Sequence, residues 1–152
     1  MKNAQNQPSI TLDERQRELV RQAVVETCDN RKYTLYAVNV RSNHAHSVIS
    51  KAIKPEKIVD DLKVRSTRKL RENWEFGSSE RVWSHGASVR YLWKPRHLAG
   101  AIDHVLYCQE NVPFEFRDRV YEVAMSPTHT DAKLSGIIAL AYARAGASIL
   151  DQ

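Results

Sequence analysis

The sequence has little cysteine, and its cysteines are badly placed for cross-linking. Cys28 and Cys108 are the only two among 152 residues, and they lie far apart in segments with helical patterning. Neither a disulfide framework nor a CxxC metal site is therefore expected, and both residues are predicted to be ordinary buried thiols. With 42% hydrophobic residues, the chain can bury a core of its own within a single domain.

Long apolar runs and several well-known motifs are also absent. No window approaches the length that spans a bilayer, and residues 1–10 are polar, without the apolar stretch of a secretion signal. No membrane partner and a cytoplasmic location are therefore expected. The GxGxxG, Walker, zinc-finger and nucleophile-elbow patterns are missing, which excludes the best-known nucleotide-binding and hydrolase classes. The net charge of +5 favours a polyanionic partner without identifying one.

Helical and strand patterns alternate in the first half of the chain. After the polar leader of residues 1–10, apolar residues recur at helical spacing over residues 11–30. Tyr33–Arg41 and His44–Lys51 are rich in the aromatic and β-branched residues of strands. The short Ser42–Asn43 connection predicts that these strands form an antiparallel hairpin.

The second half continues the same alternation. Pro55 fits the first turn of a helix that reaches about Trp74, and residues 81–83 and 89–93 predict a second hairpin. Pro95 begins a further helix that ends before Pro113, and residues 134–149 predict an alanine-rich apolar helix. Interspersed helices and antiparallel strands are typical of an α+β fold.

Two histidines stand out on the second predicted strand. His44 and His46 are separated by one residue, so both imidazoles project from the same face and can meet one metal ion. Asn39 and Arg41 lie near the same end of the hairpin, where they could hydrogen-bond a ring nitrogen or a phosphate oxygen. Such a pair alone is more often a packing feature than a metal site.

The surrounding sequence resembles a known family. Residues 42–46, Ser-Asn-His-Ala-His after an apolar strand, resemble the signature strand of the HUH nucleases, in which two histidines flank one hydrophobic residue. Residues 82–86, 89–93 and the helix containing Ala101–Gln109 resemble the final strand pair and the tyrosine helix of REP-associated and insertion-sequence single-tyrosine transposases. The elements come in the family's order over residues 11 to about 111.

The resemblance implies both a fold and a chemistry. The fold would be ferredoxin-like, with a central antiparallel β-sheet and helices packed on one face, over residues 11–111, followed by an extension, 112–152, that holds the apolar helix. The chemistry would be cleavage and rejoining of single-stranded or hairpin DNA by a tyrosine hydroxyl, with a divalent metal, Mg²⁺ or Mn²⁺, at the scissile phosphate. The implied metal ligands are His44, His46 and Gln109. Family transposases often work as dimers, so a homodimer is an open option.

Two features depart from the family pattern. The nucleophilic tyrosine is expected at the position of His104, and Tyr107, one helical turn later, is the candidate nucleophile instead. His104 competes with Gln109 as the third ligand. The family's usual first strand, in the middle of the sheet, has no counterpart before the 11–30 helix, so it is lost or supplied by another segment.

Three functions follow from this pattern. The first hypothesis is an active single-strand DNA transposase or nicking enzyme. The second is an impaired or domesticated relative that binds DNA hairpins without cleaving them. An unrelated metal-dependent hydrolase ranks last, because further acidic or histidine ligands at characteristic spacing are missing.

Basic and aromatic residues suggest where DNA would bind. The 55–74 helix carries many cations and is either a phosphate track or simply a solvated face. Trp74, Trp83, Tyr91 and Trp93 could stack on unpaired bases, although a core position is favoured for Trp83 and Trp93. The candidate DNA-binding residues are Arg41, Lys63, Arg65, Arg68, Lys69 and Arg71.

Overall fold

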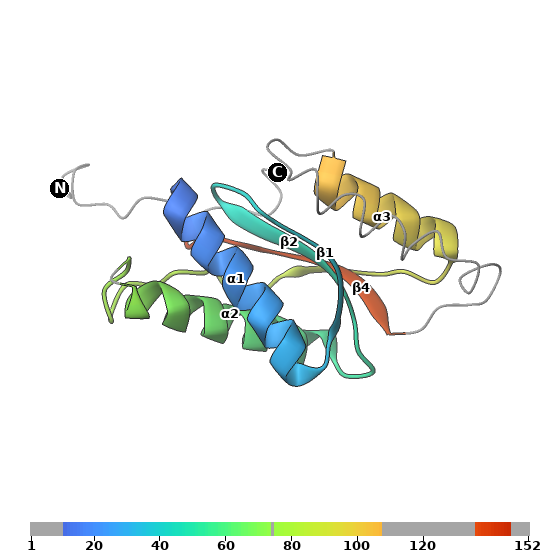
Figure 1. The fold of residues 1–152 in the computed structure, drawn as a ribbon, viewed down its shortest axis with the longest axis horizontal. Helices are drawn as coiled ribbons and strands as arrows, with labels where there is room; N and C mark the ends of the chain where they lie inside the picture. Colours follow the sequence, from blue (N-terminus) through green and yellow to red (C-terminus); the bar gives the residue numbers. More distant parts are fainter. Residues whose placement is uncertain (1–10, 74, 108–135, 147–152) are drawn as a thin grey trace.

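A four-stranded antiparallel sheet carries three helices in the described part of the chain, residues 11–73, 75–107 and 136–146 of a computed structural model (Figure 1). The helices are α1 (Glu14–Arg31), α2 (Pro55–Glu72) and α3 (Pro95–Tyr107). The strands are β1 (Thr34–Val40), β2 (His44–Ser50), β3 (Ser88–Tyr91) and β4 (Ile137–Ala143). The predicted α+β class with a central antiparallel sheet is confirmed.

The hairpin that carries the histidines forms as predicted. β1 and β2 pair antiparallel, with Asn39 opposite His46 and Val40 opposite Ala45. The Arg41 N–H donates to the His44 carbonyl at 2.8 Å, which closes the hairpin around Ser42 and Asn43. The connection is therefore the short turn that the sequence predicts.

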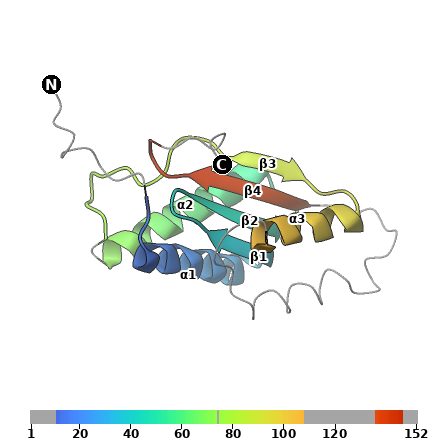
Figure 2. The same ribbon diagram turned by 90° about the horizontal axis from the view of Figure 1, so that it is seen from above.

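β4 is the central strand that the sequence does not predict. Residues 137–143 form a strand rather than the expected apolar helix, and this strand lies between β2 and β3 in the sheet order β1-β2-β4-β3 (Figure 2). Each of its seven residues pairs with β2, from Ile137 opposite Ser50 to Ala143 opposite His44. The neighbour of the histidine strand is thus supplied by a segment that follows α3 in sequence.

The predicted second hairpin is also wrong. β3 pairs with β4, and residues 81–83 contribute only an isolated bridge between Trp83 and Arg144. Close strands in a sequence usually pair, but here β4 takes the place that the 81–83 segment was expected to fill. β3 is consequently an edge strand.

Helices cover both faces of the sheet (Figure 1). α1 and α2 share one face, where Val24 and Leu62 pack in one core cluster with Ile49 and Leu140. α3 departs from the one-face arrangement, because its apolar stripe packs against the opposite face of the sheet. The residues of this second cluster include Tyr36, Ala37 and Val48 from the sheet and Leu98, Ala101, Ile102, Val105 and Leu106 from α3.

Local sequence explains where α1 begins and what it buries. Asp13 caps the helix in a capping box with Gln16, with bonds of 2.8 and 2.9 Å between side chains and backbone N–H groups. Cys28 is buried in α1, and burial raises the pKa of its thiol to about 12, in line with the predicted inert thiol. Cys108 lies outside the described residues. No helix in the described ranges has the length and hydropathy that crossing a bilayer requires.

Gly136 is required where the chain turns into β4. Its φ of +71° lies in the left-handed region, and a Cβ added there would sit 3.2 Å from the Lys51 carbonyl oxygen. The Lys51 N–H donates to the Gly136 carbonyl at 2.9 Å, so the two backbones must approach closely. Only glycine meets both demands without strain.

Candidate functional site

The histidine pair lies on the face of β2 that α3 covers. The His44 and His46 ring centroids are 4.3 Å apart, with an angle of 66° between the ring planes. Their common face follows from the period of two along a strand, as the sequence predicts. The two imidazoles are close enough to act on one ligand.

Asn43 holds the first histidine in place. Its Oδ1 lies 2.7 Å from Nδ1 of His44, which is itself buried. A carbonyl oxygen only accepts, so Nδ1 carries a proton and the contact leaves Nε2 as the atom that can face a ligand. The sequence assigns Asn43 only to the turn. The sequence feature that could have indicated its contact with the His44 ring is its position directly before that histidine.

His46 has a buried nitrogen without a hydrogen-bond partner among the described residues. The atom is Nε2. Burial, with smaller contributions from the charges of His44, His104 and Arg41, lowers the pKa of His46 to about 3. The ring is therefore neutral at pH 7. An unsatisfied buried polar atom costs about 1–3 kcal/mol, so a cation at this nitrogen would offset a cost that the fold already carries.

The donor set fits a divalent cation in part. Imidazoles ligate such ions through a ring nitrogen, and the pair presents two imidazoles on one face. Within the residues that the structure describes, no group of three or more His, Cys, Asp or Glu side chains is arranged to hold a metal. The expected third ligand, Gln109, lies outside the described residues. The pair alone therefore fits as two ligands of a larger set.

α3 brings His104 over the pair. The His46 and His104 ring centroids are 6.2 Å apart, and the His104 side chain is exposed. The helix is held here by Asn39, whose Nδ2 donates to the Val105 carbonyl at 3.0 Å. Asn39 lies opposite His46 as expected, but it bonds the helix backbone rather than a ring nitrogen. Tyr107 is the last residue of α3, and its side chain is outside the described part of the molecule.

Acid is expected to destabilise the protein through His46. Because the pKa is about 3 in the folded protein and 6.5 in the unfolded chain, the unfolded chain alone takes up a proton as the pH falls from 6.5. The free energy of unfolding should therefore be greatest above pH 6.5 and fall steadily below it. Urea unfolding with a chelator present at several pH values between 7.5 and 5 would measure the fall, which His46→Gln should reduce. An equal fall in both proteins would contradict the assignment to His46.

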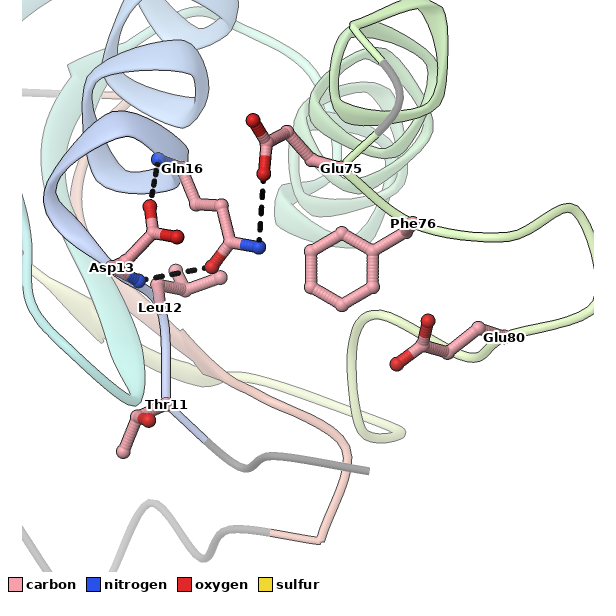
Figure 3. A pocket seen from close by; sticks show the side chains of 7 residues that line it. All are labelled: Thr11, Leu12, Asp13, Gln16, Glu75, Phe76 and Glu80. Carbon is pink, nitrogen blue, oxygen red and sulfur yellow. Dashed lines mark hydrogen bonds between the residues drawn. The ribbon is translucent and has the colours of Figure 1, made fainter. Parts of the chain in front are cut away.

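A pocket at the start of α1 lies apart from the histidines (Figure 3). It has a volume of about 300 Å³. In it, the Gln16 amide donates to Glu75 at 3.3 Å, and the Phe76 ring and Glu80 line the other side. The lining residues are Thr11, Leu12, Asp13, Gln16, Glu75, Phe76 and Glu80. Its carboxylates repel phosphate, so this pocket does not extend the candidate site toward a DNA backbone.

Comparison with protein families decides the assignment. A family model described as "Transposase IS200 like" matches residues 5–109, more than half of the chain. The chain belongs to the IS200-like transposase family. Membership confirms the resemblance to the single-tyrosine transposases and connects the chain with transposition of mobile DNA, and so with DNA as a partner. Neither a curated protein nor a solved structure matches the chain significantly.

The basic helix of this IS200-like transposase lies away from the histidines. α2 packs on the opposite face of the sheet, and three of its candidate DNA-binding cations bind within the protein. Lys63 donates to the carbonyls of Ser84 and Gly86 at 2.9 and 2.6 Å, and Arg71 donates to those of Gly77 and Glu80 at 3.2 and 3.1 Å. Lys69 pairs with Glu26 at 2.7 Å.

These contacts show that the α2 cations Lys63, Lys69 and Arg71 stabilise the fold. Lys63 and Arg71 hold the segment between α2 and β3, which the sequence pattern does not reveal. Of the other candidates, Arg65 is half-buried and Arg68 is exposed on α2. Arg41 lies near the histidines, since its charge contributes to the low pKa of His46. A DNA-binding role for these residues stays a prediction.

The aromatic residues of the IS200-like transposase divide between core and surface. Trp83 is 6% exposed and donates its Nε1–H to Ser66 Oγ at 3.1 Å, so its predicted core position is confirmed. The predicted core position of Trp93 is wrong, because its side chain is 46% exposed. It stacks instead on Tyr91, the last residue of the edge strand β3. Trp74 lies outside the described residues.

Proposed function

We propose that the protein is a single-stranded DNA transposase or nicking enzyme that cleaves and rejoins DNA by transesterification at the His44–His46 pair. One observation carries this proposal: His46 is a neutral, half-buried histidine whose buried Nε2 has no hydrogen-bond partner among the described residues, beside a second histidine on the same face. A fold that retains such a costly nitrogen is consistent with its use in ligand binding. The IS200-like family supplies the reaction class.

The two histidines would hold a divalent cation, Mg²⁺ or Mn²⁺, with Gln109 as the proposed third ligand. Such a cation, when bound, polarises a phosphoryl oxygen and stabilises developing negative charge. The protein itself orients one histidine and keeps the other unprotonated. Asn43 contacts Nδ1 of His44 and so orients its ring, and burial keeps His46 neutral, so the lone pair of His46 is available at neutral pH.

Tyr107 is the proposed nucleophile. Its hydroxyl oxygen would attack the phosphorus and lose its proton, forming a phosphotyrosine bond. The bond between phosphorus and the 3′ oxygen breaks, and that oxygen leaves as a hydroxyl after gaining a proton. Rejoining is the reverse reaction with another 3′ hydroxyl. His104, exposed on the same helix, is the alternative third ligand.

A second candidate function is DNA binding without cleavage. Among the described side chains of α3, His104 has its ring near His46, at the position where the family resemblance implies the nucleophilic tyrosine. A histidine in this place cannot form the phosphotyrosine bond. In this case the protein would hold single-stranded or hairpin DNA as an impaired or domesticated relative of the transposases.

Adduct formation separates the two functions. Purified protein would be incubated with end-labelled hairpin DNA and Mn²⁺, and denaturing gels would show whether label remains attached to protein. The first function predicts an adduct in the wild type that Tyr107→Phe removes. The second predicts binding without an adduct in the wild type. It also predicts an adduct in the double variant His104→Tyr with Tyr107→Phe, because a tyrosine would again stand near His46.

A further inference from the structure

Two aromatic side chains are stacked on the surface of the protein. The rings of Tyr91 and Trp93 are nearly parallel, with an angle of 11° and centroids 5.5 Å apart. The side chains are 48% and 46% exposed. Large aromatic side chains usually gain free energy by burial, so a paired and exposed arrangement points to a binding role. The stacking also orders both rings before any ligand arrives, which lowers the entropic cost of binding.

The stack lies on the edge of the sheet that carries the histidines. β3 is the outer strand beside β4 (Figure 2). Its Ser88 lies opposite Ala141, which lies opposite His46, so one row crosses the sheet from the histidine to the edge. Two interstrand spacings separate the ends of this row, about 10 Å. A short unpaired strand bound at the histidines can therefore reach β3.

Three basic residues lie close to the stack in sequence. Arg90 lies opposite Ala139 and so belongs to the face of the sheet that carries the histidines. Its neighbour Tyr91 lies opposite Ile138 and so belongs to the other face. Lys94 and Arg96 follow directly after Trp93, and all three basic residues are exposed. An edge strand is accessible from both faces. Cations and stacked rings at one edge are the combination that binds a single strand through both its phosphates and its bases.

We propose that Tyr91 and Trp93 form a stacking platform for unpaired bases of single-stranded DNA, with Arg90, Lys94 and Arg96 contacting the phosphates beside it. The inference deepens the proposed function, since it rests on single-stranded DNA being the substrate. It assigns the aromatic contribution to the edge of the sheet and away from the cations of α2. Duplex DNA has no unpaired bases to offer and gains nothing from the platform.

Equilibrium binding without metal tests the platform independently of cleavage. Fluorescence anisotropy would follow a labelled oligothymidylate and an oligomer of equal length with abasic sites in place of the bases, both in a chelator. Tyr91→Ala and Trp93→Ala are expected to weaken oligothymidylate binding by about 5- to 150-fold, the range found for removing one stacked base contact. The abasic oligomer should bind the wild type and these two alanine variants alike. Trp93→Phe should retain most of the affinity.

Val89→Ala is the matched control, because Val89 is an exposed residue on the same face of β3 and does not take part in the stack. Its affinity should match the wild type. Arg90→Ala should weaken both oligomers and reduce the salt dependence of binding. Circular dichroism and thermal melting would establish that each variant is folded.

Two outcomes would overturn the platform. One is a folded Trp93→Ala variant that binds oligothymidylate as tightly as the wild type. The other is a variant that loses self-association in sedimentation while keeping its DNA affinity, which would make the stack a contact between copies of the chain. The adduct assay is separate: a wild type that forms no adduct but shows the base-dependent loss refutes cleavage and retains the platform.

Discussion

Replacing His46 with alanine is expected to abolish the metal-dependent protein–DNA adduct. The substitution removes one of two imidazoles whose centroids lie 4.3 Å apart and which are the proposed ligands of the cation. Polarisation of a phosphate by a cation contributes several kcal/mol, which corresponds to a rate loss of roughly a thousandfold or more. His44→Ala should have the same effect. Gel quantification of adduct over time would measure the rates, and Mn²⁺ titration by electron paramagnetic resonance would measure the binding.

His85→Ala is the control for this prediction. His85 is exposed before Gly86, far along the chain from β2, and the histidine contacts at the site do not include it. Its adduct yield and Mn²⁺ affinity should equal those of the wild type. A folded His46→Ala protein with a normal adduct rate would show that the pair does not hold the cation that cleavage uses.

Tyr142→Ala is expected to cost about 3–5 kcal/mol in the free energy of unfolding, the range for removing a large buried aromatic side chain. Tyr142 is fully buried on β4 and meets Trp83 edge-to-face, with ring centroids 4.8 Å apart. Because β4 joins β2 to β3, a cavity here weakens the packing of both halves of the sheet. Urea denaturation followed by circular dichroism would measure the loss.

Tyr91→Ala makes the same chemical change on the neighbouring strand. Tyr91 is 48% exposed and contacts Trp93 rather than the core, so its removal should cost no more than about 1 kcal/mol. The difference between the two losses in unfolding free energy measures how much burial of the tyrosine side chain contributes to stability. Equal costs would mean that residues 137–143 do not occupy the centre of the sheet.

The histidine hairpin could be predicted because its signals are local. His44 and His46 share a face through the strand period, and the turn at Ser42 and Asn43 leaves one way for the two strands to pair. The neutral state of His46 could not be predicted. It depends on burial under α3, which is 50 or so residues away in the sequence, and burial is a property of the whole fold.

β4 was predicted as a helix because alanine has the highest helix propensity. The same residues carry a second signal, since Ile138, Leu140 and Tyr142 alternate with alanines at the period of a strand. The large side chains enter the core beside α1 and α2, and the small ones lie on the face that carries the histidines. Tertiary packing on both faces overrides the local preference for a helix.

Charge and aromatic patterns gave the least reliable predictions of position. Lys63 and Arg71 have long side chains that donate to loop carbonyls. A run of basic residues in a sequence does not reveal which group each charged end will contact. Trp93 was expected in the core because aromatic residues on strands usually are. That expectation assumed a covered strand, and β3 became an edge only because β4 took the inner position.

The position of β4 also sets an order of events during synthesis. β1 and β2 leave the ribosome long before residues 137–143 are made, and until then the inner side of the histidine strand has no partner. Pairing over such a sequence separation is slow to form, and the unpaired strand can meet other chains meanwhile. The nascent polypeptide therefore carries both histidines without the sheet that orients them. The proposed cleavage at His44 and His46 would in this way have to wait until β4 has been translated.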